Sequence, residues 1–508
     1  MSKMCVSNYT RYFIGNVIFI FVITKLKTYF QKAKQSTDAF CQISGHCKNI
    51  YFGIISIILY LCANLQNVTQ MKHLIITTIA LLATLSAVAR KGEAPLTHAT
   101  PESVGMNGEY LTRTIDSIAT HSIAERCFPG CQILVARKGK IVFSKSYGHH
   151  TYEQTQAVEN QHLYDMASCT KVLASTIALM RLVEQGQLSL DKPLSLYFEE
   201  FRGTDKEQCT LRELLAHQSG IRNLSFGRMF FEKGRTLRSD MFSRFSSEAF
   251  PYRVCDSLYA CKDTHAMMFR QIVDLPLSTK KLRYACTSFH CYPTLIERIT
   301  GRNYEEFLYG EFYRPLGIER ATYNPLHCFS REEIVPTEVD NFFRKGLVHG
   351  FVHDEAAASL GGVSGNAGLF ANAESLAPIL QMLLNGGLYN GKRYLKQKSI
   401  REWTSCQYPR NNNYRGLGFD RRRFSDKRRT AKLDNRPYYY APSVSKRSYG
   451  HSGFTGTMIW ADPKEELIFI FLTNRIHPSR DNKAFSEQNP RAKCHEAAYE
   501  AIRRFRQK

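Results

Sequence analysis

Apolar and polar positions along the chain predict strands near both ends of one domain, with helices between them. Residues 132–148 form two apolar runs joined at Arg137-Lys-Gly139, which indicates a β-hairpin. Residues 449–474 contain two more apolar runs around an Asp-Pro turn, and a helical pattern near residues 492–505 follows. We therefore predict an α/β (α+β) fold in which an antiparallel sheet, flanked by helices, pairs its terminal strands.

Helical spacing marks several segments between these runs. A helix capped by Asn107 is expected within residues 97–119, and further helices within 172–186, 210–220 and 373–384. We predict that the loop-rich part of the chain, at about residues 190–440, forms an inserted all-helical lobe that covers the sheet. We predict one domain over residues 90–508.

The N-terminal region contains apolar runs of a different kind. Residues 71–89 have a short basic start, an apolar middle and a small-x-small end, which predicts an export signal cut after Ala89. Such signals stand at the start of a protein, so we interpret Met71 as the natural initiator and residues 1–70 as upstream sequence translated in error. If Met1 is the start instead, residues 50–65 are a short candidate membrane anchor. Either way we expect export to the cell envelope, in the periplasm or outside.

Composition supports a globular protein, since 44% of the 508 residues are hydrophobic and 12% are aromatic. The formal charge of +23 comes from basic residues that are dispersed, apart from a cluster at 421–429. This dispersal argues against nucleic-acid recognition and favours a weak affinity for anionic envelope surfaces. We expect a monomer, and the sequence leaves the role of the basic cluster open.

Eleven of the 15 cysteines follow residue 89, an odd number, so we expect at least one unpaired thiol. Three pairs are close enough in sequence to form disulfides in an oxidising compartment: Cys127/Cys131, Cys255/Cys261 and Cys286/Cys291. No His/Cys cluster has convincing zinc spacing, and we expect neither a metal nor a cofactor.

The chemistry is concentrated in Tyr164-Asp-Met-Ala-Ser-Cys-Thr-Lys171, just before an apolar helix. Ser168 and Lys171 would lie on one helix face, so that a neutral lysine could take the serine proton. Ser-x-x-Lys also occurs three times elsewhere, but only Ser168 opens an apolar helix; the other pairs are Ser189/Lys192, Ser278/Lys281 and Ser443/Lys446. The structural alternative is an N-cap serine beside a solvated lysine.

From about residue 101 to residue 473, the chain resembles the serine beta-lactamase and penicillin-binding-protein superfamily, in its class C beta-lactamase, D-alanyl-D-alanine carboxypeptidase and esterase branch. Three motifs occur in the order of that superfamily: Ser168-Cys-Thr-Lys171, Tyr284-Ala-Cys286 and His451-Ser-Gly453. Segments 215–220, 361–365 and 453–457 are similar as well. Their ordered occurrence is far more specific than any one motif, and it implies a beta-lactamase/transpeptidase-like fold.

The resemblance implies a role for each motif. Ser168 would be the acylated nucleophile, Lys171 the proton acceptor and Tyr284 the relay to the leaving group, and His451 would flank a substrate carboxylate. The backbone N–H groups of Ser168 and Phe454 would form the oxyanion hole. Three further residues would contact substrate: Cys286, Ser452 and Gly453.

These roles predict an exported serine hydrolase that acts through an acyl-enzyme on an ester, a D-amino-acid peptide or a beta-lactam. Burial beside a tyrosine should lower the pKa of Lys171. Cys286 stands where lactamases and peptidases usually have asparagine, so we rank esterase or peptidase above lactamase. The alternatives are a slowly acylating penicillin-binding sensor of the envelope and a membrane-anchored scaffold.

Overall fold

The protein is described by a computed structural model that covers residues 94–232, 236–423 and 438–507. The predicted export signal at 71–89, the extension at 1–70 and the Lys427-Arg-Arg429 part of the basic cluster lie outside these ranges. Within them, no helix combines the length and apolarity that crossing a membrane requires.

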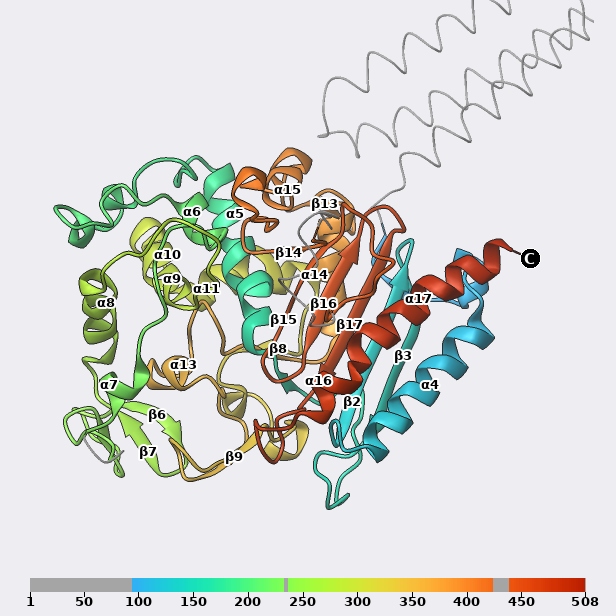
Figure 1. Cartoon of the computed structure of the whole chain (residues 1–508), viewed down its shortest axis with the longest axis horizontal. Helices are drawn as coiled ribbons and strands as arrows, with labels where there is room; N and C mark the ends of the chain where they lie inside the picture. The colour runs from blue at the N-terminus through green and yellow to red at the C-terminus, as the bar shows by residue number, and fades with distance from the viewer. Residues whose placement is uncertain (1–93, 233–235, 424–437, 508) are drawn as a thin grey trace, which may run out of the picture. The chain divides into compact units, whose positions relative to one another are not determined.

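A seven-stranded sheet forms the centre of the molecule (Figure 1). Its strands, in spatial order, are β1 (Thr97–His98), β3 (Lys140–Gly148), β2 (Gly130–Arg137), β17 (Leu467–Thr473), β16 (Met458–Asp462), β15 (Tyr449–Ser452) and β14 (Asp420–Arg421). All neighbours are antiparallel except β1 and β3. The predicted hairpin is confirmed, because β2 pairs with β3. The predicted pairing of strands from opposite ends of the domain is also confirmed, because every residue of β17 pairs with β2.

The C-terminal segment contains one strand more than we predicted. β15 precedes the two apolar strands and pairs with β16. It was missed because His451 and Ser452 interrupt any apolar run in this four-residue strand. The strand nevertheless carries the third family motif.

Both faces of the sheet are buried, and alternate residues point to different cores. Leu134 and Ile470 belong to the core shared with the lobe, whereas Val135 and Phe469 belong to the opposite core. Helices α4 (Gly108–Ala124) and α17 (Pro490–Arg506) cover that opposite face and lie side by side in Figure 1. As predicted, Asn107 caps α4, accepting a 2.9 Å bond from the Tyr110 N–H.

The other face of the sheet carries α14 (Ala373–Leu384), as predicted. Helix α5 (Ile177–Glu184) lies between this face and the lobe (Figure 1). The remaining helices are α6 (Leu211–Leu215), α7 (Phe226–Phe230), α8 (Thr264–Asp274), α9 (Thr287–His290), α10 (Tyr292–Thr300), α11 (Tyr304–Leu308), α12 (Arg314–Leu316), α13 (Glu355–Ser359), α15 (Gln397–Trp403) and α16 (Ala484–Gln488). A capping box at Thr210 starts α6.

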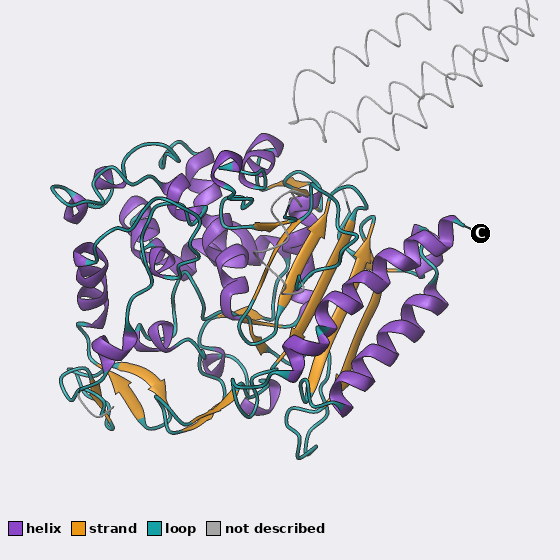
Figure 2. Ribbon diagram, in the orientation of Figure 1, coloured by secondary structure: helices purple, strands orange, loops and turns teal. Residues whose placement is uncertain are grey.

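The lobe also contains short strands, so its expected all-helical character is wrong in this respect (Figure 2). They are β5 (Phe242–Ser243), β6 (Tyr252–Cys255), β7 (Leu258–Ala260), β9 (Glu338–Asp340), β10 (Gly346–Val348), β12 (Leu388–Tyr389) and β13 (Lys392–Arg393). A further small sheet joins β4 (Tyr164–Asp165), β11 (Phe370–Ala371) and β8 (Ala321–Thr322). Strands of two to four residues are too short to show an alternating pattern.

The three cysteine pairs that sequence spacing suggested are not bonded, because all eleven cysteines in the described ranges are free. The side chains of the last pair have separate surroundings. Cys291 is buried in the core of the lobe, whereas Cys286 contacts Lys171. Proximity in sequence therefore does not bring these two sulfurs together.

Candidate active site

Ser168 lies on a tight turn between β4 and α5. The turn is a 3₁₀ segment, Ala167–Cys169, followed by a wider π-helical segment, Lys171–Thr176, where a regular α-helix was expected. Ala167 has a φ of 44°, which is unusual for a residue with a side chain. The buried Asp165 carboxylate stabilises this backbone, since its Oδ1 accepts a 2.8 Å bond from the Ala167 N–H. The turn presents Ser168 at the surface of a cavity.

The structure brings three predicted catalytic groups together at the Ser168 hydroxyl. Lys171 Nζ donates to Ser168 Oγ at 2.9 Å, and the Tyr284 hydroxyl donates to the same oxygen at 3.1 Å. Lys171 is fully buried, whereas Tyr284 is 39% exposed and lines the cavity. The structural alternative, in which Lys171 is a solvated side chain, is therefore excluded.

Lys171 has three acceptors for its three protons when charged. Besides Ser168, Nζ donates to the backbone oxygen of Asn366 at 3.0 Å and to Cys286 Sγ at 3.5 Å. Asn366 directly follows the glycine-rich segment 361–365, which is similar to the superfamily and for which we predicted no role. Its backbone oxygen supports the lysine amine.

The pKa of Lys171 is raised, so the expected lowering is wrong. Burial by itself lowers this pKa, but the charges of Cys286, Tyr284 and Asp354 together outweigh that effect. Burial also raises the pKa of Tyr284, which the nearby Lys171 charge partly offsets. At neutral pH the resting site therefore holds an ammonium and a phenol.

Tyr284 lies in a loop before α9. His217 holds this loop in place: its Nδ1 accepts from the Ala285 N–H at 3.2 Å, and its carbonyl accepts from the Arg283 N–H at 3.0 Å. The rings of His217 and Tyr284 are tilted to each other, with centroids 4.5 Å apart. The segment 215–220 thus positions the phenol, a role that its sequence alone does not reveal.

His451, on β15, lies beside the same group of side chains. Its Nδ1 donates to the Ser452 carbonyl at 2.8 Å, which leaves Nε2 without a proton and without a hydrogen-bond partner in the described ranges. Burial and the charges of Arg415 and Lys171 hold the pKa of His451 well below its usual range. The ring is therefore neutral, and it offers an acceptor where we expected a partner for a carboxylate.

The loop after β15 is held tightly against the nucleophile turn. The hydroxyls of Thr455 and Thr457 donate to the carbonyls of Asp165 and Met166 at 2.8 and 3.0 Å. A Cβ on Gly453 would lie 2.1 Å from Thr457 Oγ1 and 2.7 Å from the Met166 oxygen, so only glycine fits there.

This close approach places Ser168 and Phe454 on the lining of one cavity. Their N–H groups remain the predicted oxyanion donors.

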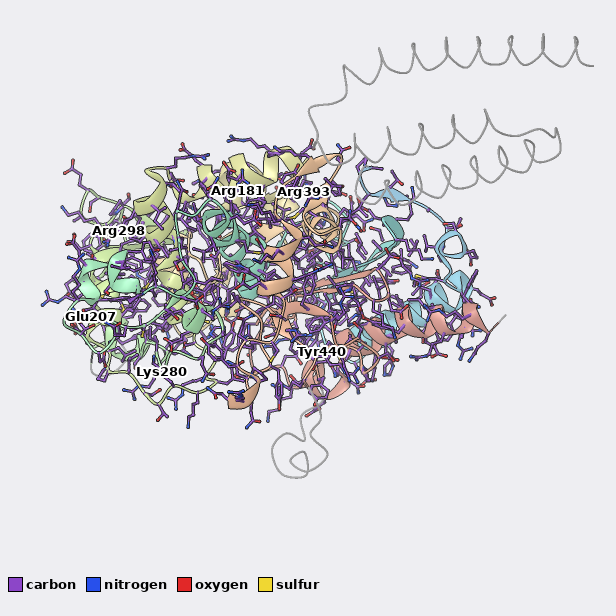
Figure 3. All side chains as sticks on the ribbon, turned by 90° about the horizontal axis from the view of Figure 1, so that it is seen from above. Arg181, Glu207, Lys280, Arg298, Arg393 and Tyr440 are labelled. Atoms are coloured by element: carbon purple, nitrogen blue, oxygen red, sulfur yellow. The ribbon has the colours of Figure 1, made fainter. Side chains whose placement is uncertain are left out.

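The cavity has a volume of about 670 Å³. Its lining includes all the predicted site residues except the buried Lys171, and it adds an aromatic and a charged wall. The aromatic side chains are Tyr414, Tyr439, Tyr440 (labelled in Figure 3) and Phe454; the charged ones are Asp354, Glu355, Asp420, Arg415, Arg421, Arg423 and Arg480. Apart from Phe454, sequence reasoning assigned none of these residues to the site, because they come from several distant segments.

Arg415 lies over the ring of Tyr284, with Cζ 5.5 Å from the ring centroid. Its guanidinium pairs with Asp420, which also accepts from the Tyr439 hydroxyl. Burial lowers the pKa of Arg415, and the carboxylate of Asp420 compensates its charge.

No three His, Cys, Asp or Glu side chains in the described ranges are grouped so that they could hold a metal ion. His353 is bound to Glu338 at 2.6 Å. Its ring stacks on Phe454 at 5.6 Å and so supports the wall of the cavity.

Comparison with known proteins agrees with this geometry. The sequence profile of the Beta-lactamase family matches residues 115–488. A protein of Salmonella agona (strain SL483), named for D-alanyl-D-alanine carboxypeptidase activity, is 28% identical over 443 residues, which cover 80% of this chain and 92% of that protein.

Two solved structures share the fold. A penicillin-binding-protein homologue from Caulobacter crescentus has a TM-score of 0.55 at 18% identity, covering 78% of this chain and 99% of its own. The D-amino acid amidase of Ochrobactrum anthropi SV3 has a TM-score of 0.53 at 17% identity, with the same coverage. Both support the predicted sheet, flanking helices and lobe. Because the family profile extends over most of the chain, this protein belongs to the beta-lactamase family of serine hydrolases.

Proposed function

We propose that this protein is an exported hydrolase of the cell envelope that forms an acyl-enzyme on Ser168 and removes the terminal residue from peptides ending in D-alanyl-D-alanine. The observation that carries the proposal is the meeting of the Lys171 and Tyr284 donors at the Ser168 hydroxyl, on the lining of an open cavity. Relatives named for this activity, aligned over nearly their whole length, support the substrate and the envelope location.

The reaction follows from the positions of these groups. With Lys171 in its neutral form, the Ser168 oxygen attacks the peptide carbonyl carbon while its proton passes to Nζ. The N–H groups of Ser168 and Phe454 hold the oxyanion that forms. Tyr284 gives its proton to the leaving nitrogen and takes the proton held by Lys171 in its place, the C–N bond breaks and D-alanine departs. Water then cleaves the Ser168 ester by the same proton path in reverse.

Charge on the cavity wall suits a substrate that ends in a carboxylate. Arg421 and Arg423 line the cavity in and beside β14, and their field attracts anions. Because His451 is neutral, this attraction comes from the arginines and not from the imidazole.

The raised pKa of Lys171 predicts how the reaction depends on pH. Only the neutral amine accepts the serine proton, and raising its pKa makes that form scarcer at pH 7. Acylation of Ser168 should therefore become faster from about pH 6 to about pH 9, without a plateau near neutrality. The rate of labelling by a fluorophosphonate, measured across this range, checks the prediction. A rate that is constant above about pH 7 would contradict it.

An ester substrate is the second candidate, favoured by one observation. Cys286 stands where an asparagine would hold the amide carbonyl of a peptide, and its sulfur instead contacts Lys171. A thiol is a poor partner for an amide, whereas an ester needs less positioning before attack.

Turnover of three substrates separates these functions. We expect the purified protein to release D-alanine from a D-Ala-D-Ala tripeptide, and the Ser168→Ala variant to release none. Hydrolysis of p-nitrophenyl acetate alone would favour the esterase. A stable adduct with fluorescent penicillin, without turnover of tripeptide, ester or nitrocefin, would favour the non-hydrolysing sensor and overturn the proposal.

A further inference from the structure

Asp354 is a carboxylate on the cavity wall that none of the family motifs includes. It lies at the start of α13, where Oδ1 accepts a 2.9 Å bond from the Ala357 N–H and caps the helix. Its other oxygen, Oδ2, accepts a 3.2 Å bond from the side-chain nitrogen of Asn366. The carboxylate thus joins the cavity wall to the residue that supports Lys171.

Asn366 is 1% exposed and is bonded through three of its groups. Its backbone oxygen accepts from Lys171 Nζ at 3.0 Å, and its side-chain Oδ1 accepts from Ser364 Oγ at 2.8 Å. Ser364 Oγ in turn contacts His290 Nδ1 at 3.0 Å. With the side-chain nitrogen bound to Asp354, the residue can hardly move without moving the lysine amine.

The charges around Lys171 come from several elements. Cys286 and Tyr284 become negative only on losing a proton, and three histidines near the lysine are held neutral by burial: His217, His290 and His451. Asp354 differs from all of these groups in being a carboxylate. It also raises the pKa of Lys171, as an opposite charge should.

We propose that Asp354 and Asn366 are positioning residues for the acylation of Ser168: Asn366 holds the Lys171 amine beside the serine, and Asp354 holds Asn366 in place and adds a carboxylate to the surroundings of the amine. Neither residue contacts Ser168, so both act through Lys171. The inference rests on the proposed function, because its readout is acylation of that serine.

Glu355 provides a matched control. It is the next residue, it lines the same cavity, and it is also an acid in the first turn of α13. Its carboxylate accepts a 2.9 Å bond from Arg480 and, within the part of the chain that the structure describes, makes no hydrogen bond to Lys171 or Asn366. Asp354→Asn and Glu355→Gln each remove one carboxylate from the same cavity wall. Only Asp354→Asn removes the carboxylate that is linked through Asn366 to Lys171.

The test measures the rate of fluorophosphonate labelling against pH for the full-length protein and these variants. In Asp354→Asn the rising limb should move to lower pH by about 0.5–1 unit, because loss of the carboxylate lowers the pKa of Lys171. Asparagine at position 354 still caps α13. Glu355→Gln should keep the wild-type profile. Asn366→Ala should lower the rate by about tenfold at every pH with little change in the shape of the profile, since it removes support and no charge.

Equal midpoints for Asp354→Asn, Glu355→Gln and wild type would overturn the inference, while labelling of Ser168 would still stand for the proposed function. Absence of labelling in the wild type would overturn both. If Asp354→Asn does not fold, Asp354→Ser provides the same test, because serine also caps a helix and carries no charge.

Discussion

Replacing Lys171 with alanine is expected to slow acylation of Ser168 by about 1,000-fold. The amine is 2.9 Å from the serine oxygen, and in the neutral form it is the group placed to accept the proton. Tyr284 reaches the same oxygen, but its raised pKa keeps it a proton donor at neutral pH. The variant therefore loses its base and retains the nucleophile.

The measurement is the rate of fluorophosphonate labelling at a fixed pH, together with a thermal melt to confirm folding. Lys192→Ala is the matched control, since Lys192 belongs to another Ser-x-x-Lys sequence and is exposed. It should label at the wild-type rate. If Lys171→Ala also does so, the proton acceptor is another group and the mechanism proposed above is wrong.

Replacing Ser168 with alanine should have the largest effect, reducing both labelling and turnover to background. No other group in the described cavity is a serine hydroxyl held between a lysine and a tyrosine. The cavity created is that of one oxygen atom, so the fold should be retained.

Two serines from the other Ser-x-x-Lys sequences serve as controls for this variant. Ser278 Oγ donates to the Gly220 carbonyl at 2.9 Å, and Ser443 Oγ donates to Glu496 at 2.5 Å. Both are structural, so Ser278→Ala and Ser443→Ala should leave labelling intact. Loss of labelling in either of them, with Ser168→Ala still labelled, would place the nucleophile elsewhere.

Local patterns in the sequence predicted those parts of the fold that depend on local regularity. The continuous apolar runs in β2, β16 and β17 follow from strands buried on both faces, and the cap at Asn107 follows from the needs of a helix N-terminus. The order of the three motifs correctly predicted that Ser168, Lys171 and Tyr284 meet.

The supporting residues could not be predicted in this way, because they act across long sequence separations. His217 and Asn366 contact the site through hydrogen bonds to or from backbone groups, and their partners Ala285 and Lys171 lie far away in the sequence. No local spacing reveals such contacts. The direction of the pKa shift of Lys171 was missed for the same reason, since it depends on the distances to Cys286 and Asp354.

Cys286 marks the point where this chain departs most clearly from the superfamily pattern. Its thiol occupies one of the three positions around the lysine amine, and its backbone N–H is held by Asn223 Oδ1 at 2.7 Å. A residue fixed so firmly shapes both the lysine environment and the substrate space. The choice between peptide and ester substrates therefore depends on this position more than on the nucleophile itself.

The most direct test locates the covalent bond that the mechanism requires. The protein is treated with a fluorophosphonate, digested, and its peptides are analysed by mass spectrometry. We predict a single adduct on Ser168, in the sequence Tyr164-Asp-Met-Ala-Ser-Cys-Thr-Lys171. An adduct on any other residue, or an unmodified Ser168 after complete loss of hydrolytic activity, would contradict the proposed chemistry.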